Sequence, residues 1–245
     1  MKAGVDQQRL LLELAEIDAE LARIDHRTKN LPARAELEAQ QRRHQEATDR
    51  LAVLGIAVED IDAEAAKLES EIEAVRRREE RDRAMLEGGG VNAKQLTELQ
   101  HELQTLERRK SSLEDSLLDV MERREQLDAE RAGVSAEVDE LQQQVQNAQQ
   151  TVDEALAELA RTRQQRTARR EELIAELDAE LVALYERQRT RGGVGAGPLQ
   201  GGRCGACQIE IDRGELARFS AAAEDDVLRC PECGAILLRV KEFNR

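Results

Sequence analysis

Four cysteines near the C-terminal end of the chain have the residue type and the spacing of a metal site. They form two C-x-x-C pairs, Cys204 with Cys207 and Cys230 with Cys233, and 22 residues lie between the pairs. Thiolates are strong ligands of Zn²⁺, and two such pairs at this separation are typical of a tetrahedral zinc site. Because four thiolates fill the coordination shell and leave no position for water, we expect one structural Zn²⁺ rather than a catalytic one.

Redox exchange and structural disulfides are the two other common uses of such cysteine pairs. A redox pair usually belongs to a βαβ unit, and the sequence around these cysteines shows no such pattern. Disulfides require an oxidising compartment, whereas the first residues of the chain lack the apolar stretch of an export signal. No apolar run approaches the roughly 18 residues of a membrane span. We therefore expect a soluble, cytoplasmic protein that binds zinc.

The residues that precede the cysteines have the composition of long helices rather than of a globular domain. Charged residues make up 36% of the chain and aromatic residues 1%, and there are only three prolines. Apolar residues also recur at alternating steps of three and four, which is the pattern of a coiled-coil seam. The clearest runs extend from Leu10 to Leu31, from Leu51 to Val75 and from Leu96 to Leu159. The third run has charges at only three seam positions, Lys110, Arg124 and Arg131.

Two interruptions divide this pattern. Pro32 predicts a kink near 30–34, because proline removes a helical hydrogen bond. Three consecutive glycines, Gly88–Gly90, predict a reversal near 87–92, after which Asn92 can cap a new helix. The arms on either side of the glycines have similar lengths, so residues 1–191 are expected to form an antiparallel coiled-coil hairpin within a monomer. Pairing of each helix with a second chain is the alternative.

The composition changes at 192–202, which is rich in glycine and is predicted to be a linker. Residues 203–245 would then form the zinc ribbon, with short strands such as 208–211 beside the cysteine pairs and with Phe219 and Phe243 in its core. A domain of this size buries little apolar surface, so zinc binding should supply much of its folding free energy. The predicted fold is mainly α: a long antiparallel coiled-coil hairpin with a small C-terminal β zinc ribbon.

A long coiled-coil hairpin followed by CGACQIEI and then LRCPECGAILL resembles the bacterial C4-type zinc ribbon domain proteins. The segment VNAKQLTELQHELQTLE is similar to the start of that family's second helix, although Gln95 and Thr97 stand where an acid and an alanine are common there. The resemblance covers nearly the whole chain, and it implies that the four cysteines ligate zinc. Family members of similar architecture bind an alternative sigma factor or flagellar transcripts, so the resemblance implies partners connected with transcription.

The net charge argues against a surface built for nucleic acid. The formal net charge of the chain is −14, and residues 192–245 carry seven Lys and Arg against eight Asp and Glu. Zn²⁺ with four thiolates would add about −2 to that region. Proteins that bind nucleic acid usually carry a basic face, because phosphate contacts supply most of the affinity.

One basic cluster does occur, five arginines without an acid among ten residues. Its members are Arg161, Arg163, Arg166, Arg169 and Arg170. Pairing across the turn places this cluster against the N-terminal helix. The nearby acids of that helix are Glu13, Glu16, Asp18 and Glu20. We favour interhelical ion pairs at this cluster, and a stripe that contacts nucleic acid or a partner is the alternative.

No group of residues in the sequence has the arrangement of a catalytic site. The three histidines are scattered, and Gly88–Gly90 lacks the Lys-Ser/Thr that follows the glycines of a phosphate-binding loop. We therefore expect a non-enzymatic interaction protein, a protein-binding adaptor or regulator linked to transcription. The alternative is an RNA- or DNA-binding regulator that uses the ribbon and the 161–170 cluster. A third hypothesis is a switch that responds to zinc or to oxidation.

Overall fold

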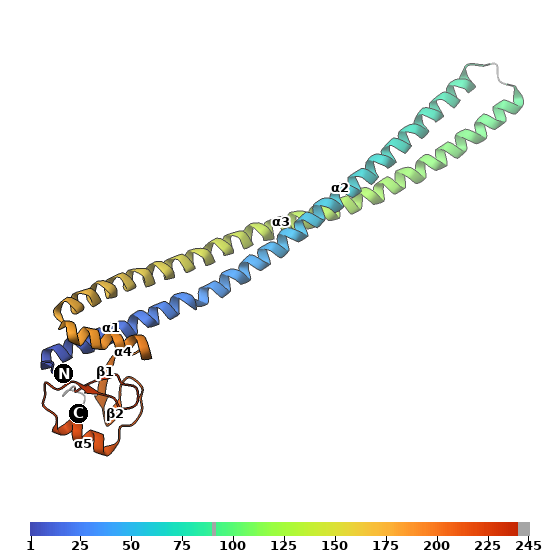
Figure 1. Ribbon diagram of the computed structural model, residues 1–245. Coiled ribbons are helices and arrows are strands. Elements are labelled where there is room, and N and C mark those ends of the chain that lie inside the picture. The colour runs from blue at the N-terminus through green and yellow to red at the C-terminus, as the bar shows by residue number, and fades with distance from the viewer. Residues whose placement is uncertain (90–91, 240–245) are drawn as a thin grey trace. The chain divides into compact units, whose positions relative to one another are not determined.

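The computed structural model describes residues 1–89 and 92–239, which form two compact units (Figure 1). The hairpin unit contains residues 33–150, and the ribbon unit contains residues 1–32 together with residues 151–239. None of the helices in the described ranges combines the length and the apolar character that crossing a membrane requires.

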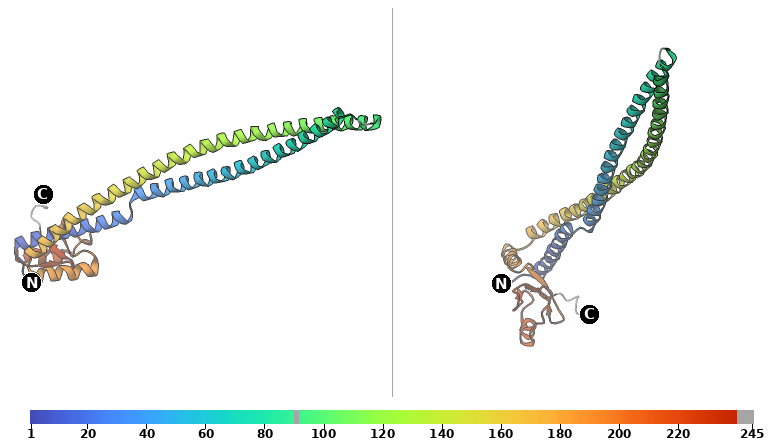
Figure 2. Two further views of the ribbon diagram at one scale, coloured as in Figure 1. Left: turned by 90° about the horizontal axis from the view of Figure 1, so that it is seen from above. Right: turned by 90° about the vertical axis from the view of Figure 1, so that its right-hand side faces the viewer.

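The hairpin unit consists of two antiparallel helices that lie side by side (Figure 2). They are α2 (Pro32–Glu87) and the 93–150 part of α3 (Ala93–Glu176). Seam residues of α2 such as Val58, Ile61 and Ile72 are buried. Ion pairs flank the seam, for example Arg50 with Glu137 at an N···O distance of 2.7 Å. The predicted antiparallel hairpin is confirmed, and its seam is filled from within the chain.

Both predicted interruptions of the helices are confirmed. A first helix, α1 (Val5–Lys29), ends just before Pro32, which is the first residue of α2 and therefore has no helical hydrogen bond to lose. At the turn, the Gln95 backbone N–H donates to Asn92 Oδ1 (2.9 Å) and the Asn92 backbone N–H donates to Gln95 Oε1 (3.0 Å). This reciprocal capping box starts α3. Gly90 and Val91 lie outside the described residues.

The seam of α2 continues beyond Val75 through two acids that the apolar pattern did not include. Glu79 is 3% exposed and Asp82 is 8% exposed. Glu79 pairs with Lys110 of α3 at 3.6 Å, whereas Glu79 Oε1 and Asp82 Oδ2 have no hydrogen-bond partner among the described residues. A charged pair inside a coiled-coil seam specifies the register of the two helices at a cost in stability.

In the ribbon unit, α1 and the 151–176 part of α3 pack with a further helix, α4 (Ala179–Gly192). Leu11, Leu14 and Leu181 are fully buried in this core. The Gln7 side chain bridges the break between α3 and α4. Its Nε2 donates to the Glu176 carbonyl (3.0 Å), and its Oε1 accepts from the Asp178 backbone N–H (2.8 Å).

A small sheet and one short helix complete the ribbon unit. The strands are β1 (Ala196–Gln200), β2 (Arg203–Cys204), β3 (Leu228–Arg229) and β4 (Ile236–Leu238), and the helix is α5 (Arg213–Ala221). The strand order is β2-β1-β4-β3, with β1 and β4 parallel and the other pairs antiparallel.

Both faces of the sheet are covered. Ile236 and Leu238 belong to the helical core, whereas Leu237, between them, packs in a second core with Phe219. This follows from the alternation of side chains along a strand. The prediction that Phe219 is a core residue is confirmed, and Phe243 lies outside the described residues.

The prediction of a linker at 192–202 is wrong, because β1 lies inside that segment and pairs with both β2 and β4. The glycines there permit close packing rather than flexibility. A Cβ atom on Gly195 would lie 2.5 Å from the Tyr185 ring, and one on Gly197 would lie 2.8 Å from the Ala206 backbone nitrogen. The sheet therefore starts at Ala196. The predicted strand at 208–211 is also wrong, since only Glu210 forms an isolated bridge there, with Arg203.

Candidate metal centre

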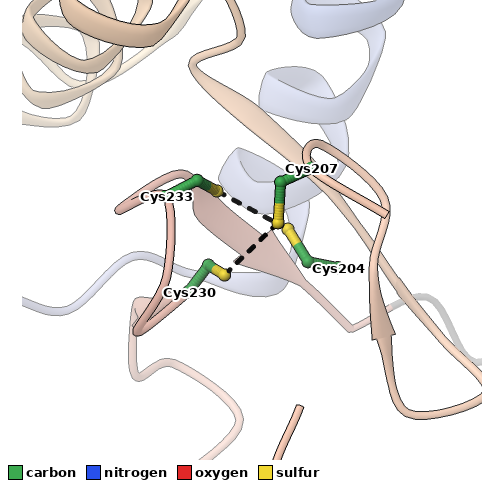
Figure 3. Close-up of side chains that lie close together, drawn as sticks. All are labelled: Cys204, Cys207, Cys230 and Cys233. Carbon is green, nitrogen blue, oxygen red and sulfur yellow. Dashed lines mark hydrogen bonds between the residues drawn. The ribbon is translucent and has the colours of Figure 1, made fainter. Parts of the chain in front are cut away.

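The four cysteines converge on one point at the edge of the ribbon core (Figure 3). All four sulfur atoms lie within 4.8 Å of one another. Cys204 Sγ and Cys233 Sγ are 3.8 Å apart, and Cys207 Sγ and Cys230 Sγ are 3.9 Å apart. Each close pair therefore takes one sulfur from each C-x-x-C motif.

Local backbone hydrogen bonds shape both knuckles. In the first, the Gln208 N–H donates to the Cys204 carbonyl at 2.8 Å, and in the second the Gly234 N–H donates to the Cys230 carbonyl at 3.0 Å. The residue after each motif has a left-handed conformation, with φ of 63° at Gln208 and 77° at Gly234. The two knuckles are thus alike in geometry, and each directs both of its sulfurs inward.

The sulfur positions fit a zinc ion. A Zn–S bond is about 2.3 Å long, so the edge of a regular ZnS₄ tetrahedron is about 3.8 Å. The two close sulfur distances, 3.8 and 3.9 Å, match that edge. Zn²⁺ held by four thiolates has no open coordination position, so its role here is structural. A disulfide is a different arrangement, since bonded sulfurs lie about 2.05 Å apart.

Protonation opposes metal binding at these thiols. Burial raises the pKa of the Cys204 thiol and raises the pKa of Cys233 to about 12. Burial acts on Cys230 as well, but hydrogen bonds from the Cys233 and Glu232 backbone and from neighbouring thiols leave its pKa below the ordinary value. Since zinc binds thiolates, its binding must release protons, and affinity must fall as the pH falls.

Helix α4 reaches the second knuckle through Gln188, a residue that the sequence analysis did not identify. Gln188 is 7% exposed, and its Nε2 donates to the Cys233 carbonyl at 2.6 Å. Arg229 Nε donates to the Gly234 carbonyl at 3.1 Å. A Cβ atom on Gly234 would lie 3.0 Å from Gln188 Oε1. The metal site is therefore packed against the helical core rather than carried on a free domain.

The N-terminal residues also bind the ribbon. The Ala3 backbone N–H donates to the Asp225 carbonyl at 2.7 Å, and the Val227 N–H donates to the Met1 carbonyl at 3.2 Å. Lys2 Nζ pairs with the Asp225 carboxylate at 2.9 Å, and this contact holds the pKa of Asp225 below its usual range. These contacts add a strand-like segment beside the residues that lead into β3.

The predicted arginine cluster is neutralised by acids. Arg161 pairs with Glu158 of its own helix at 2.7 Å. The other four arginines pair with α1, as the sequence predicted, although Glu16 has no ion pair among the described residues. The interhelical pairs are Arg163–Asp25, Arg166–Glu20, Arg169–Glu13 and Arg170–Asp18, with N···O distances of 3.5, 2.7, 2.9 and 2.7 Å.

The Asp18 carboxylate joins α1, α3 and α4. Its side chain is 9% exposed, and it accepts from Arg170 Nε and from the Tyr185 hydroxyl, each at 2.7 Å. Arg170 also contacts Glu186. Burial, with the hydrogen bond and charge of Asp18, raises the pKa of Tyr185 well above its ordinary value. The innermost arginine of the cluster is thus part of the helical packing.

A helical hairpin joined to a four-cysteine zinc ribbon defines the class of this protein. The family model of the CT398-like coiled coil hairpin domain matches residues 14–193, and that of the C4-type zinc ribbon domain matches residues 203–237. The chain belongs to the CT398-like coiled-coil hairpin family with a C-terminal C4-type zinc ribbon.

Relatives match over nearly their whole length. An uncharacterized protein of Mycobacterium tuberculosis (strain ATCC 25618 / H37Rv) is 58% identical over 243 residues, which is 99% of each chain. A solved structure from Mycobacterium smegmatis has a TM-score of 0.87 and 61% identity, and the match covers 98% of this chain and 100% of that one. CT398 from Chlamydia trachomatis shares the fold, with a TM-score of 0.65 and 16% identity over 96% of this chain and 98% of its own.

Proposed function

We propose that this chain is a non-enzymatic interaction protein of the cytoplasm, a protein-binding adaptor or regulator linked to transcription that acts as a monomer. The observation that carries the proposal is the pairing of all five arginines of the 161–170 cluster with carboxylates. Phosphate binding would have to displace these acids. A protein surface is the better match for a chain with a net charge of −14.

The chemistry of the site supports a role without catalysis. Four thiolates around one zinc leave no place for a reacting water. His26 and His101 are exposed on separate helices, α1 and α3. Zinc in this arrangement stabilises the ribbon. Reduced thiolate ligands also suit the reducing conditions of the cytoplasm.

The proposed link to transcription rests on the family resemblance. The proposal that the chain is a monomer rests on the coiled-coil seam between α2 and α3. The buried seam residues of α2 face α3 of the same chain, so the coiled coil does not need a second copy to cover them.

Nucleic-acid binding is the alternative function, and two arginines favour it. The Arg161 side chain is 72% exposed and the Arg163 side chain is 61% exposed, and Arg163 holds its partner at 3.5 Å. These two could exchange a carboxylate for a phosphate more easily than the inner members of the cluster, such as Arg170, whose side chain is 18% exposed.

Fluorescence anisotropy with labelled single-stranded RNA and double-stranded DNA distinguishes the protein-binding adaptor from the nucleic-acid-binding regulator. At physiological salt we expect dissociation constants no tighter than the roughly 10⁻⁴–10⁻⁶ M of non-specific binding. The double variant Arg161→Ala/Arg163→Ala should bind as the parent does. Submicromolar binding that this variant loses, with a steep dependence on salt, would instead establish the nucleic-acid function.

A further inference from the structure

Two large apolar residues of α3 point away from the seam of the hairpin unit. Leu118 is 60% exposed and Met121 is 49% exposed. Leu118 lies two residues before Val120, which is buried in the seam, and two residues turn a helix through about 200°. The Leu118 side chain is therefore on the side of α3 opposite α2, and Met121 lies one turn further along. Adjacent apolar side chains in such a position are typical of an interaction surface.

Acidic side chains border this apolar pair on both sides. Asp115 lies three residues before Leu118, and Glu122 lies four residues after it. Glu125 lies four residues after Met121. Residues three and four apart are neighbours on a helix, so the three acids and the apolar pair share one surface, which we call the α3 face. All three acids are exposed, and none of them has an ion pair within residues 1–89 and 92–239.

The negative charge of the chain is concentrated around the α3 face. Residues 111–136 contain seven Asp and Glu against three Arg, and residues 51–75 contain seven Asp and Glu against one Lys. The two segments lie side by side, since Arg124 of the first pairs with Asp62 of the second. Together they carry a net charge of −10, out of −14 for the whole chain. A surface of this sign attracts cations and repels other anionic surfaces.

We propose that the α3 face binds a basic amphipathic helix of a partner protein, with apolar residues against Leu118 and Met121 and with Lys or Arg beside the flanking acids. This inference rests on the proposed adaptor function and names the chemistry of the partner. A helix is the matching shape, because its apolar residues recur at the spacing of Leu118 and Met121. A second copy of the chain does not fit, because its acids would face these acids. Phosphate has the same sign of charge as the surface, so nucleic acid does not fit either.

A second exposed apolar pair, on α2, provides a matched control. Val53 is 65% exposed and Ile56 is 60% exposed, but Arg50 rather than an acid lies three residues before Val53. The α3 double variant, Leu118→Gln/Met121→Gln, should fold as the parent does, because glutamine, leucine and methionine have similar helix propensities. The α2 double variant, Val53→Gln/Ile56→Gln, makes the same kind of change outside the α3 face.

The first test uses a labelled synthetic peptide with leucines along one helical face and lysines beside them. Fluorescence anisotropy measures its binding to the full chain. We expect the α3 double variant to bind at least about tenfold more weakly, since both apolar contacts are lost, and the α2 double variant to bind as the parent does. Glu122→Lys should weaken binding about fivefold, because a repulsion replaces an attraction. Equal binding by the two double variants, or equal binding of a peptide with glutamates in place of the lysines, would overturn the proposal.

The second test places a photo-crosslinking residue at Ser111, which is exposed four residues before Asp115, in the full chain in its native cells. We expect mass spectrometry to identify a segment of another protein with apolar residues flanked by Lys or Arg, and the α3 double variant to lower the yield about tenfold. Cross-links to an acidic segment, to nucleic acid, to a second copy or to nothing contradict the proposal.

The two levels of the argument can fail separately. If affinity purification retains a protein partner after nuclease treatment and the α3 double variant retains it equally well, the α3 face is not the docking surface, and the adaptor function stands. If no protein partner is retained at all, both proposals fail.

Discussion

Gln188 Nε2 of α4 donates to the Cys233 carbonyl at a distance of 2.6 Å. This hydrogen bond joins the helical core of the ribbon unit to the backbone of the second zinc knuckle. A Cβ atom on Gly234, the next residue, would lie 3.0 Å from Gln188 Oε1, so a side chain there would press against Gln188. The position of a zinc ligand is thus set partly by a helix that lies far from it in sequence.

Removing the Gln188 side chain should weaken zinc binding. Partners in the outer shell of a metal site typically contribute about 10–100-fold to affinity, and we expect Gln188→Ala to lose zinc to a chromophoric chelator about 10 times more readily than the parent. Arg187→Ala, which changes an exposed neighbour on the same helix, is the control. Equal zinc affinity in both variants would show that the hydrogen bond does not position the ligand.

Loss of zinc should loosen the whole ribbon unit and leave the hairpin unit folded. The strands that frame the metal site place Ile236 and Leu238 in one core with Leu11 and Leu14 of α1. We expect Cys204→Ser, which removes one ligand, to increase hydrogen exchange in both α1 and the sheet. Amides of residues 40–80 should keep their protection. Unchanged exchange in α1 would show that the ribbon unfolds independently of the helices.

The free energy of unfolding should fall in alkaline solution because Tyr185 is buried. Burial and the Asp18 hydrogen bond raise the pKa of Tyr185 above its unfolded value of 10.0. The stabilisation is fully present below pH 10 and diminishes as the pH rises above it, because only the unfolded state then ionises. Since the chain has one tyrosine and no tryptophan, phenolate absorbance reports this residue alone. We expect that absorbance to appear together with the loss of helical circular dichroism. Ionisation near pH 10 with the helices intact would contradict the buried contact.

Asp82 should limit the stability of the hairpin unit. Its carboxylate occupies a seam position. Asp82 Oδ2 has no hydrogen-bond partner among the described residues, and its ion pair with Arg78 Nε of the same helix is long, at 3.8 Å. Replacing a buried charge with a well-packed apolar side chain often stabilises a protein by about 1–4 kcal/mol. We expect Asp82→Leu to raise the denaturant midpoint, and Glu80→Leu, at an exposed neighbour, to change it little. A destabilised Asp82→Leu variant would mean that the pair with Arg78 stabilises the native seam by more than an apolar side chain would.

Local rules were enough to predict the hairpin and the zinc ligands. The steps of three and four, the kink at Pro32 and the cap at Asn92 depend on neighbours within a few residues, and the two C-x-x-C pairs form their knuckles through backbone hydrogen bonds within a few residues of each cysteine. The strand at Ala196–Gln200 could not be predicted in this way, because the glycines that suggested a linker are explained only by contacts such as that of Gly195 with Tyr185. Gln188 was missed for the same reason, since a glutamine in a glutamine-rich chain acquires its role from tertiary contact alone.

Affinity purification of the tagged chain from a lysate of its native cells, with and without nuclease, tests the central claim most directly. The adaptor function predicts a specific protein partner that is retained after nuclease treatment and at raised salt, with no enrichment of RNA or DNA. Enriched nucleic acid, together with protein partners that disappear on nuclease treatment, would contradict the claim and would support the arginines of the 161–170 cluster as phosphate contacts.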